Sequence, residues 1–161
     1  MAQTNEPLLS VKGLKQYFPV SKKFTVRAVD NISFDIYPGE TYGLVGESGS
    51  GKSTTGRSII RLYDPTEGTI LFNGEDISKK LTAKQEKMLR SDMQMVFQDP
   101  MASLNPHKKI LDTIAMGLDA HHPHMDQKER VERVSKMMEM VGLNPAYMNR
   151  YPNQFSGGQR Q

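Results

Sequence analysis

The chain has 161 residues, of which 37% are hydrophobic and 24% charged, with a net charge of +3 and no cysteine. This composition suits one globular domain, or a core with one inserted lobe, and it excludes a disulfide framework and a cysteine-ligated metal site. No apolar run approaches the ~20 residues of a membrane-spanning helix, residues 1–7 lack a signal-peptide pattern, and the interleaved charges favour a solvated surface over one that binds nucleic acid.

Short apolar runs bounded by Gly, Pro, Asn or Asp characterise the first part of the chain. They predict strands at 8–14, 32–36, 41–45, 69–72 and 93–97. The second of these alternates apolar and polar residues, as a half-buried strand does, whereas the third and the last are typical of buried strands. Asn73-Gly74 follows the fourth directly and is a strong hairpin signal. Helical spacing predicts helices from about 51 to 62 and from 82 to 90.

Beyond residue 98 the character of the sequence changes. Prolines punctuate this region, and its periodic segments are helical, at 110–118 and 126–141. The sequence therefore predicts an α/β nucleotide-binding core over residues 1–98, followed by a helical lobe over residues 99–161.

A glycine-rich loop lies between the strand predicted at 41–45 and the helix that follows it. It fits the pattern G-x-x-x-x-G-K-S/T, in which main-chain N–H groups and a helix N-terminus converge on phosphate oxygens. Lys52 would reach the β- and γ-phosphates, and the Ser53 hydroxyl would ligate Mg²⁺. Chance would produce this pattern about once in 200 chains of this length, so we favour a site for ATP and Mg²⁺. Its residues are Gly46, Glu47, Ser48, Gly49, Ser50, Gly51, Lys52, Ser53 and Thr54.

Further segments, in the right order, resemble the ATPases of ATP-binding-cassette (ABC) transporters. Residues 95–100, Met-Val-Phe-Gln-Asp-Pro, resemble the glutamine loop of this family, and residues 155–161, Phe-Ser-Gly-Gly-Gln-Arg-Gln, resemble its signature motif. Phe18, with Tyr17 beside it, lies where the family places an aromatic residue against adenine. The resemblance spans essentially the whole chain. It implies an α/β P-loop NTPase core with an antiparallel β subdomain and a helical subdomain.

The resemblance extends to a subfamily. Residues 17–20, residues 97–100 with 102–106, and residues 149–152 are similar to the ATPases of oligopeptide and dipeptide importers, most of all to the second of their two ATPase subunits. This implies a subunit that couples ATP binding and hydrolysis to peptide uptake, bound peripherally to the cytoplasmic face of the cell membrane. The implied partners are a second ABC ATPase subunit in a head-to-tail dimer, transmembrane permease subunits and, indirectly, an extracellular peptide-binding protein, with no nucleic acid.

The resemblance also implies roles for single residues. Gln98 and Lys52 would be the catalytic residues, with the Gln98 amide contacting Mg²⁺ or the attacking water. The γ-phosphate bound by the partner subunit would be contacted by Ser156, Gly157, Gly158 and Gln159. Ser156 is also typical of a helix cap. For Phe18 or Tyr17, ordinary packing at the end of a strand is the alternative to stacking on adenine.

The family pattern continues, after the signature, with a strand ending in Asp-Glu, a further loop and a switch histidine. None of these lies within the 161 residues. The resemblance thus predicts a chain truncated at the signature motif, incomplete at its C-terminus and unable to hydrolyse ATP alone, with the apolar side chains of Leu44, Val45 and Val96 left open. The alternatives are a non-catalytic nucleotide-binding fragment, an ABC ATPase for another substrate, and an ABC-type ATPase acting on DNA or ribosomes.

Overall fold

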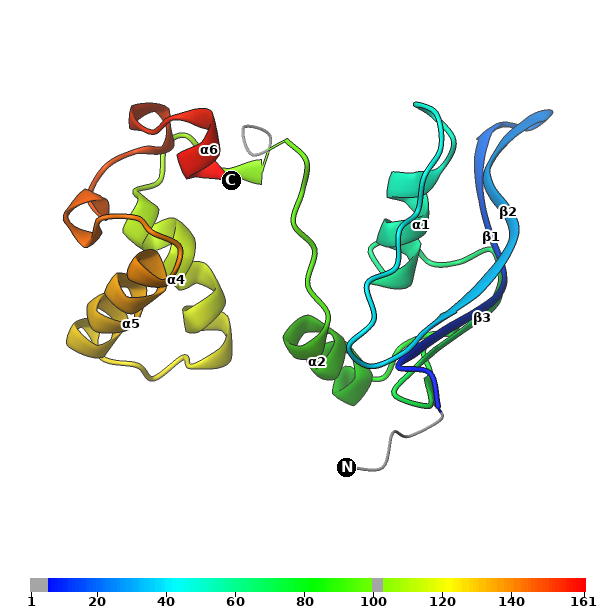
Figure 1. Cartoon of the computed structure of the whole chain (residues 1–161), viewed down its shortest axis with the longest axis horizontal. Helices are drawn as coiled ribbons and strands as arrows, with labels where there is room; N and C mark the ends of the chain where they lie inside the picture. Colours follow the sequence, from blue (N-terminus) through cyan, green and yellow to red (C-terminus); the bar gives the residue numbers. More distant parts are fainter. Residues whose placement is uncertain (1–5, 100–102) are drawn as a thin grey trace. The chain divides into compact units, whose positions relative to one another are not determined.

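A computed structural model describes residues 6–99 and 103–161 (Figure 1). The chain divides into two compact units, Met1–Met95 and Val96–Gln161. Pro100 and Ala102, which belong to a segment that resembles peptide importers, lie outside the described residues. None of the helices within the described ranges combines the length and the apolar character needed to cross a bilayer.

The first unit is built on an antiparallel sheet of four strands in the order β2-β1-β3-β4. These strands are β1 Leu9–Ser21, β2 Phe24–Ile36, β3 Glu67–Phe72 and β4 Glu75–Asp76. β1 and β2 extend well beyond the predicted 8–14 and 32–36, because they pair with each other along their length and form a long ribbon (Figure 1). β3 pairs with β1 only between Leu9 and Lys15. The predicted hairpin is confirmed, since Asn73 and Gly74 connect β3 to β4 at positive φ.

The ribbon carries irregularities in its register that shape the side facing α1 (Lys52–Ile59). Between Gln16 and Tyr17 of β1, the partner residue in β2 moves from Val29 to Arg27. Ala28 is therefore the extra residue of a β-bulge, a feature that bends a strand and re-aims its backbone groups. The Ala28 carbonyl points toward the start of α1, where it lies against Gly51.

The apolar core of the first unit lies where the sheet meets the helices. Its buried members are Leu9, Val11, Leu14, Val29, Ile70, Phe72, Ile77 and Leu89. Leu89 comes from α2 (Ala83–Asp92), the helix predicted at 82–90, which begins at a capping box formed by Thr82 and Gln85. Ile59 of α1 packs against this core as a partly buried side chain. Side-chain packing on the sheet therefore fixes both helices of this unit.

The prediction of strands at 41–45 and 93–97 is wrong. Neither segment has regular secondary structure, and no strand of the described residues pairs with them. The expectation of open apolar faces is confirmed, since Leu44, Val45 and Val96 are 45%, 91% and 78% exposed. Apolar runs of this kind are stable as strands inside a parallel sheet that is covered on both faces. The described sheet is wholly antiparallel, so their backbone groups have no ladder to join.

The second unit is helical. Its helices are α4 Ile110–His121, α5 Gln127–Met140 and the short α6 Gly157–Arg160, with 3₁₀ turns η1 Pro145–Tyr147 and η2 Pro152–Gln154. α4 and α5 confirm the helices predicted from the apolar spacing. Asp126 caps α5 by accepting a hydrogen bond from the Glu129 N–H at 2.9 Å, and Gly142 ends it at φ +74°. The core of this unit consists of Ile110, Ala115, Leu118, Val134, Met138 and Phe155.

Two valines of β1 provide a matched test of this packing. Val11 is fully buried, whereas Val20 is 66% exposed. We expect Val11→Ala to lower the free energy of unfolding by about 2 kcal/mol, through lost burial and a residual cavity. Val20→Ala should change it by less than about 0.5 kcal/mol. Urea unfolding followed by circular dichroism measures both, and equal losses would contradict the placement of the core.

Candidate functional site

The glycine-rich loop folds around the side chain of Lys52. The Lys52 ammonium donates hydrogen bonds to the carbonyls of Gly46 at 2.9 Å and Glu47 at 2.6 Å. It also lies 3.3 Å from the Ser50 hydroxyl. The Ser50 N–H closes the turn by donating to the Glu47 carbonyl at 3.2 Å. The structure thus brings the predicted loop residues together, with a cation at their centre.

Glycines shape this loop for different physical reasons. Gly51, the residue before α1, has φ +88°, and a Cβ added there would collide with the Ala28 carbonyl. Gly49 has φ +83°, but a Cβ there would meet no atom within 4 Å. A Cβ on Gly46 would lie 2.6 Å from the Ser50 hydroxyl oxygen. Gly51 is therefore constrained by both backbone conformation and space, and Gly49 by conformation alone.

The N-terminus of α1 has no side-chain cap and no acidic residue in its first turn. Its first N–H groups have no partner within the helix, and the helix dipole is positive at this end. Ser53 and Ser48 are exposed, so their hydroxyls are accessible from solvent. An ammonium, uncapped N–H groups and the Ser53 hydroxyl are a donor set that suits a polyphosphate. The Ser53 oxygen is a hard ligand of the kind that Mg²⁺ takes.

The two aromatic candidates have different surroundings in β1. Phe18 meets the ring of Tyr63 edge-on, with the centroids 5.3 Å apart. The Tyr17 hydroxyl donates to the Asp30 carboxylate at 2.5 Å, and the Arg27 guanidinium lies 5.4 Å from the Tyr17 ring centroid. The hydrogen bond to Asp30, above all, raises the pKa of Tyr17. Both rings are partly buried and already have partners within the first unit.

The signature residues surround the start of α6 in the second unit. The Ser156 hydroxyl accepts from the Gln159 N–H at 3.3 Å, and the Gln159 side chain accepts from the Ser156 N–H at 3.0 Å. These bonds form a capping box. Ser156 therefore is a helix cap, as its residue type predicts. The exposed residues of the motif are Ser156, Gly157, Gly158, Gln159 and Gln161.

Buried neighbours hold the signature motif in place. Phe155 is 5% exposed, and its ring meets that of Tyr147 edge-on at 6.2 Å. The Arg160 guanidinium donates to the Pro152 carbonyl at 2.7 Å. The chain is thus anchored on both sides of the exposed Ser-Gly-Gly-Gln segment. Gln98, the remaining candidate, also belongs to the second unit and is exposed.

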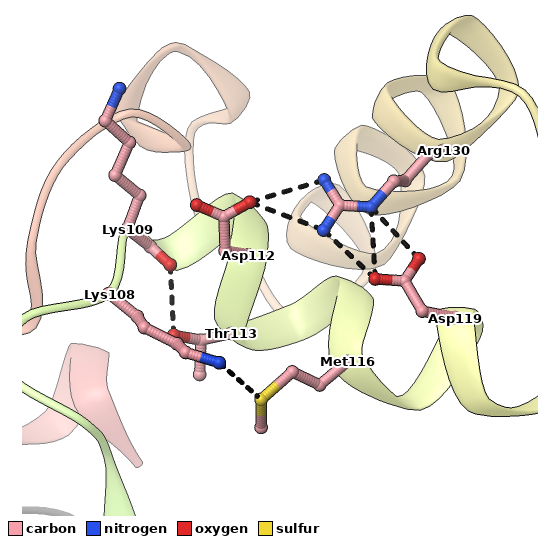
Figure 2. Close-up of polar contacts among 7 residues, drawn as sticks. All are labelled: Lys108, Lys109, Asp112, Thr113, Met116, Asp119 and Arg130. Carbon is pink, nitrogen blue, oxygen red and sulfur yellow. Dashed lines mark hydrogen bonds and ion pairs between the residues drawn. The ribbon is translucent and has the colours of Figure 1, made fainter.

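An ionic cluster that the sequence analysis missed joins α4 to α5 (Figure 2). Arg130 of α5 lies between two carboxylates of α4, with Nε 3.0 Å from Asp119 and Nη2 3.3 Å from Asp112. The hydrogen bond to Asp119 is the main cause of a raised pKa for Arg130. Asp112 and Asp119 are one helical repeat of seven residues apart, which is the signal that could have identified them. This cluster connects α4 to α5. Its residues are distant in sequence from the signature motif.

Comparisons with known proteins agree with the family resemblance seen in the sequence. The family described as "ABC transporter" matches residues 29–161. The oligopeptide transport ATP-binding protein OppF of Bacillus subtilis (strain 168) is 58% identical over 156 residues, which cover 97% of this chain and 51% of OppF. The dipeptide transport ATP-binding protein DppF of Lactococcus lactis subsp. cremoris (strain MG1363) is 48% identical over 156 residues, 96% of this chain and 50% of DppF. The chain spans about half the length of these relatives.

Solved structures show the same fold. The ATP-binding cassette MJ0796, in a dimeric post-hydrolysis state bound to ADP and Pi, is 28% identical with a TM-score of 0.81, covering 94% of this chain and 65% of that chain. The structure of cbiO1 from Clostridium perfringens, part of the ABC transporter complex cbiONQ, is 25% identical with a TM-score of 0.72. It covers 97% of this chain and 58% of that chain. The fold class expected from the sequence is therefore confirmed.

Alanine substitutions at Gly51 and Gly49 distinguish the effect of a steric clash from the effect of backbone strain. Both positions have positive φ, but only at Gly51 would the new Cβ meet the Ala28 carbonyl. We expect Gly49→Ala to lower the free energy of unfolding by about 1 kcal/mol and Gly51→Ala to lower it by at least about 2 kcal/mol more. Chemical denaturation of both variants measures the difference. Equal losses would show that α1 does not approach the ribbon as closely as described.

The Tyr17–Asp30 hydrogen bond predicts a shifted phenol titration. The bond stabilises the neutral phenol, so its contribution to stability is present at neutral pH and is lost as the pH rises through the raised pKa of folded Tyr17. In Asp30→Ala, we expect the pKa of Tyr17 to fall toward its ordinary value of about 10. Phenolate absorbance during a pH titration measures this. Tyr17→Phe identifies the Tyr17 transition among those of the six tyrosines, and an unchanged transition in Asp30→Ala would count against the bond.

Proposed function

The chain belongs to the ABC transporter family, and from this we propose that it is the nucleotide-binding part of an ATPase subunit of a peptide importer. The observation that carries the proposal is the loop closed around the Lys52 ammonium at the uncapped start of α1. The names of the relatives, OppF and DppF, support peptides as the transported substrate. In this proposal, ATP binding and hydrolysis by the whole protein drive peptide uptake across the cell membrane.

In this proposal, Lys52 is the residue that binds the phosphates. Its ammonium would exchange the Gly46 and Glu47 carbonyls for phosphate oxygens of the nucleotide, and the N–H groups at the start of α1 would donate to the phosphates as well. Ser53, in the first turn and exposed, would hold Mg²⁺ through its hydroxyl. When bound, Mg²⁺ would neutralise charge that develops on the β- and γ-phosphate oxygens.

We assign the remaining residues by the same family pattern. We assign the nucleotide-binding core with its β subdomain to residues 1–98 and the helical subdomain to residues 99–161, whereas the compact units divide three residues earlier, after Met95. Phe18 is the aromatic residue for adenine, since alternation along β1 places it on the same face as Gln16, whose side chain meets α1. Lys52 and Gln98 are the catalytic residues in this pattern, and the exposed Gln98 amide would contact Mg²⁺ or the attacking water.

The exposed signature residues suit a role in trans. Ser156 has its own N–H and hydroxyl engaged in the capping box, while Gly157 and Gly158 are exposed and carry no side chain that would block an approaching anion. We propose that this segment faces the γ-phosphate held by a second ABC ATPase subunit, in a head-to-tail dimer. The dimeric state of the MJ0796 cassette supports such a pairing.

The whole protein would work at the cytoplasmic face of the membrane. Transmembrane permease subunits would be its direct partners there, and an extracellular peptide-binding protein would deliver the cargo to them. The chain spans about half the length of OppF and DppF, so we assign nucleotide binding to these residues and turnover to the whole protein.

Lys52→Ala tests the phosphate assignment. Because Lys52 would contact phosphate and not the base, the variant should weaken ATP binding by roughly a hundredfold, as expected for the loss of a charge-assisted contact of about 3 kcal/mol. Adenosine binding should stay unchanged. Isothermal titration calorimetry with Mg²⁺ and a slowly cleaved ATP analogue measures the first, and competition with adenosine measures the second.

The exposed Lys80 supplies the control, because Lys80→Ala makes the same change of charge away from the loop. Similar effects of the two variants, or equal weakening of ATP and adenosine by Lys52→Ala, would refute the role given to Lys52.

A further inference from the structure

The helix that begins at the phosphate loop is attached to the sheet in an unusual way. Its buried residues are Thr55 and Ser58, and both are polar. The Thr55 hydroxyl stays within the helix and donates to the Gly51 carbonyl at 3.0 Å. Ser58 has no exposed surface, and its hydroxyl lies both 2.9 Å from the Thr54 carbonyl within the helix and 3.2 Å from the Gln16 side-chain oxygen of β1. The Ser58 hydroxyl therefore links α1 to the sheet through a buried hydrogen bond to Gln16.

Gln16 is a buried polar residue in the middle of β1, with only 4% of its surface exposed. Apolar packing is non-directional and permits small shifts of one element over another. A buried hydrogen bond fixes the separation and direction of its two partners, and leaving either partner unpaired is costly. The bond between Ser58 and Gln16 thus sets the position of α1 along the ribbon more tightly than apolar contacts would.

Three contacts of α1 and of the segment after it lie on the same ribbon. At the start of the helix, Gly51 lies against the Ala28 carbonyl. Beyond its end, the Tyr63 ring lies against Phe18. In the sequence, Ser58 lies between Gly51 and Tyr63, and its partner Gln16 is on the ribbon. Gln16 is also the residue directly before Tyr17 and Phe18 in β1.

We propose that Gln16, acting through Ser58, is a positioning residue that fixes the phosphate-binding end of α1 relative to the aromatic residues of β1. One nucleotide can then contact the start of α1 with its phosphates and the aromatic residues of β1 with its base at the same time. A ligand that occupies two subsites binds most tightly when the protein holds those subsites at a fixed distance and orientation. Binding at one subsite then places the other end of the ligand at the second subsite, with no further ordering of the protein. This inference rests on the proposed function, since it requires a nucleotide that spans the loop and the ribbon.

The test compares a ligand that spans both subsites with one that fills only the phosphate loop. The two ligands are ATP, as a slowly cleaved analogue, and inorganic tripolyphosphate, each titrated with Mg²⁺ into the 161-residue chain by calorimetry. Gln16→Met keeps the length of the side chain and removes its hydrogen-bonding groups. We expect the Kd for the ATP analogue to rise roughly tenfold, the effect of losing one net hydrogen bond. The Kd for tripolyphosphate should stay unchanged, which also shows that the loop remains folded.

Ser58→Ala removes the same bond from the other side, together with the intrahelical bond to the Thr54 carbonyl, and provides a second variant should Gln16→Met unfold. It should produce the same loss, and the double variant should lose no more than either single one, because both changes act through one bond. Ser91→Ala is the matched control, since the exposed Ser91 hydroxyl bonds only within α2, to the Lys87 carbonyl at 3.1 Å. It should leave both Kd values unchanged.

Three results would overturn the inference while leaving the proposed function intact. They are an unchanged ATP affinity in Gln16→Met and Ser58→Ala, equal weakening of ATP and tripolyphosphate, and losses that add in the double variant. The second of these would assign the bond to general support of the helix. If the unaltered chain bound neither ligand, the proposed function itself would fail, and the inference would fail with it.

Discussion

The close approach of α1 to the β1–β2 ribbon is the constraint on which the site depends. Gly51 can lie against the Ala28 carbonyl only because it has no side chain and because its backbone adopts φ +88°. The β-bulge at Ala28 presents that carbonyl to the helix. A single extra residue in β2 and a single glycine before α1 therefore determine together where α1 begins, and Lys52 is the first residue of that helix.

Elements with local signals could be predicted from the sequence. The helices of the second unit follow from apolar spacing, the β3–β4 hairpin follows from Asn73-Gly74, and the phosphate loop follows from its glycines and lysine. The strands expected at 41–45 and 93–97 could not be judged in this way, because a strand exists only where another strand pairs with it. The length of the β1–β2 ribbon was missed for the same reason, since pairing extends both strands through residues with mixed patterns.

The site shows the same division between local and tertiary information. The loop residues are adjacent in the sequence, so a pattern can identify them. Gln16 and Ala28 are distant from the loop in sequence and have no unusual residue type, yet they lie against α1, Gln16 at the side chain of Ser58 and Ala28 at Gly51. Only the register of the ribbon, with its bulge, brings them there. The capping role of Ser156 was predictable, because a serine before two glycines and a glutamine is a local signal.

The Lys52 ammonium has one more consequence for how an anion enters the loop. Its protons already point at protein oxygens at hydrogen-bonding distance from Gly46 and Glu47. An ammonium in open water carries a tight hydration shell that an incoming anion has to strip away. Here the protein's own carbonyl dipoles take the place of much of that shell, so the exchange of partners occurs between groups that are already held in position. In the proposed function, a phosphate would therefore meet an ammonium whose position is already fixed by the Gly46 and Glu47 carbonyls.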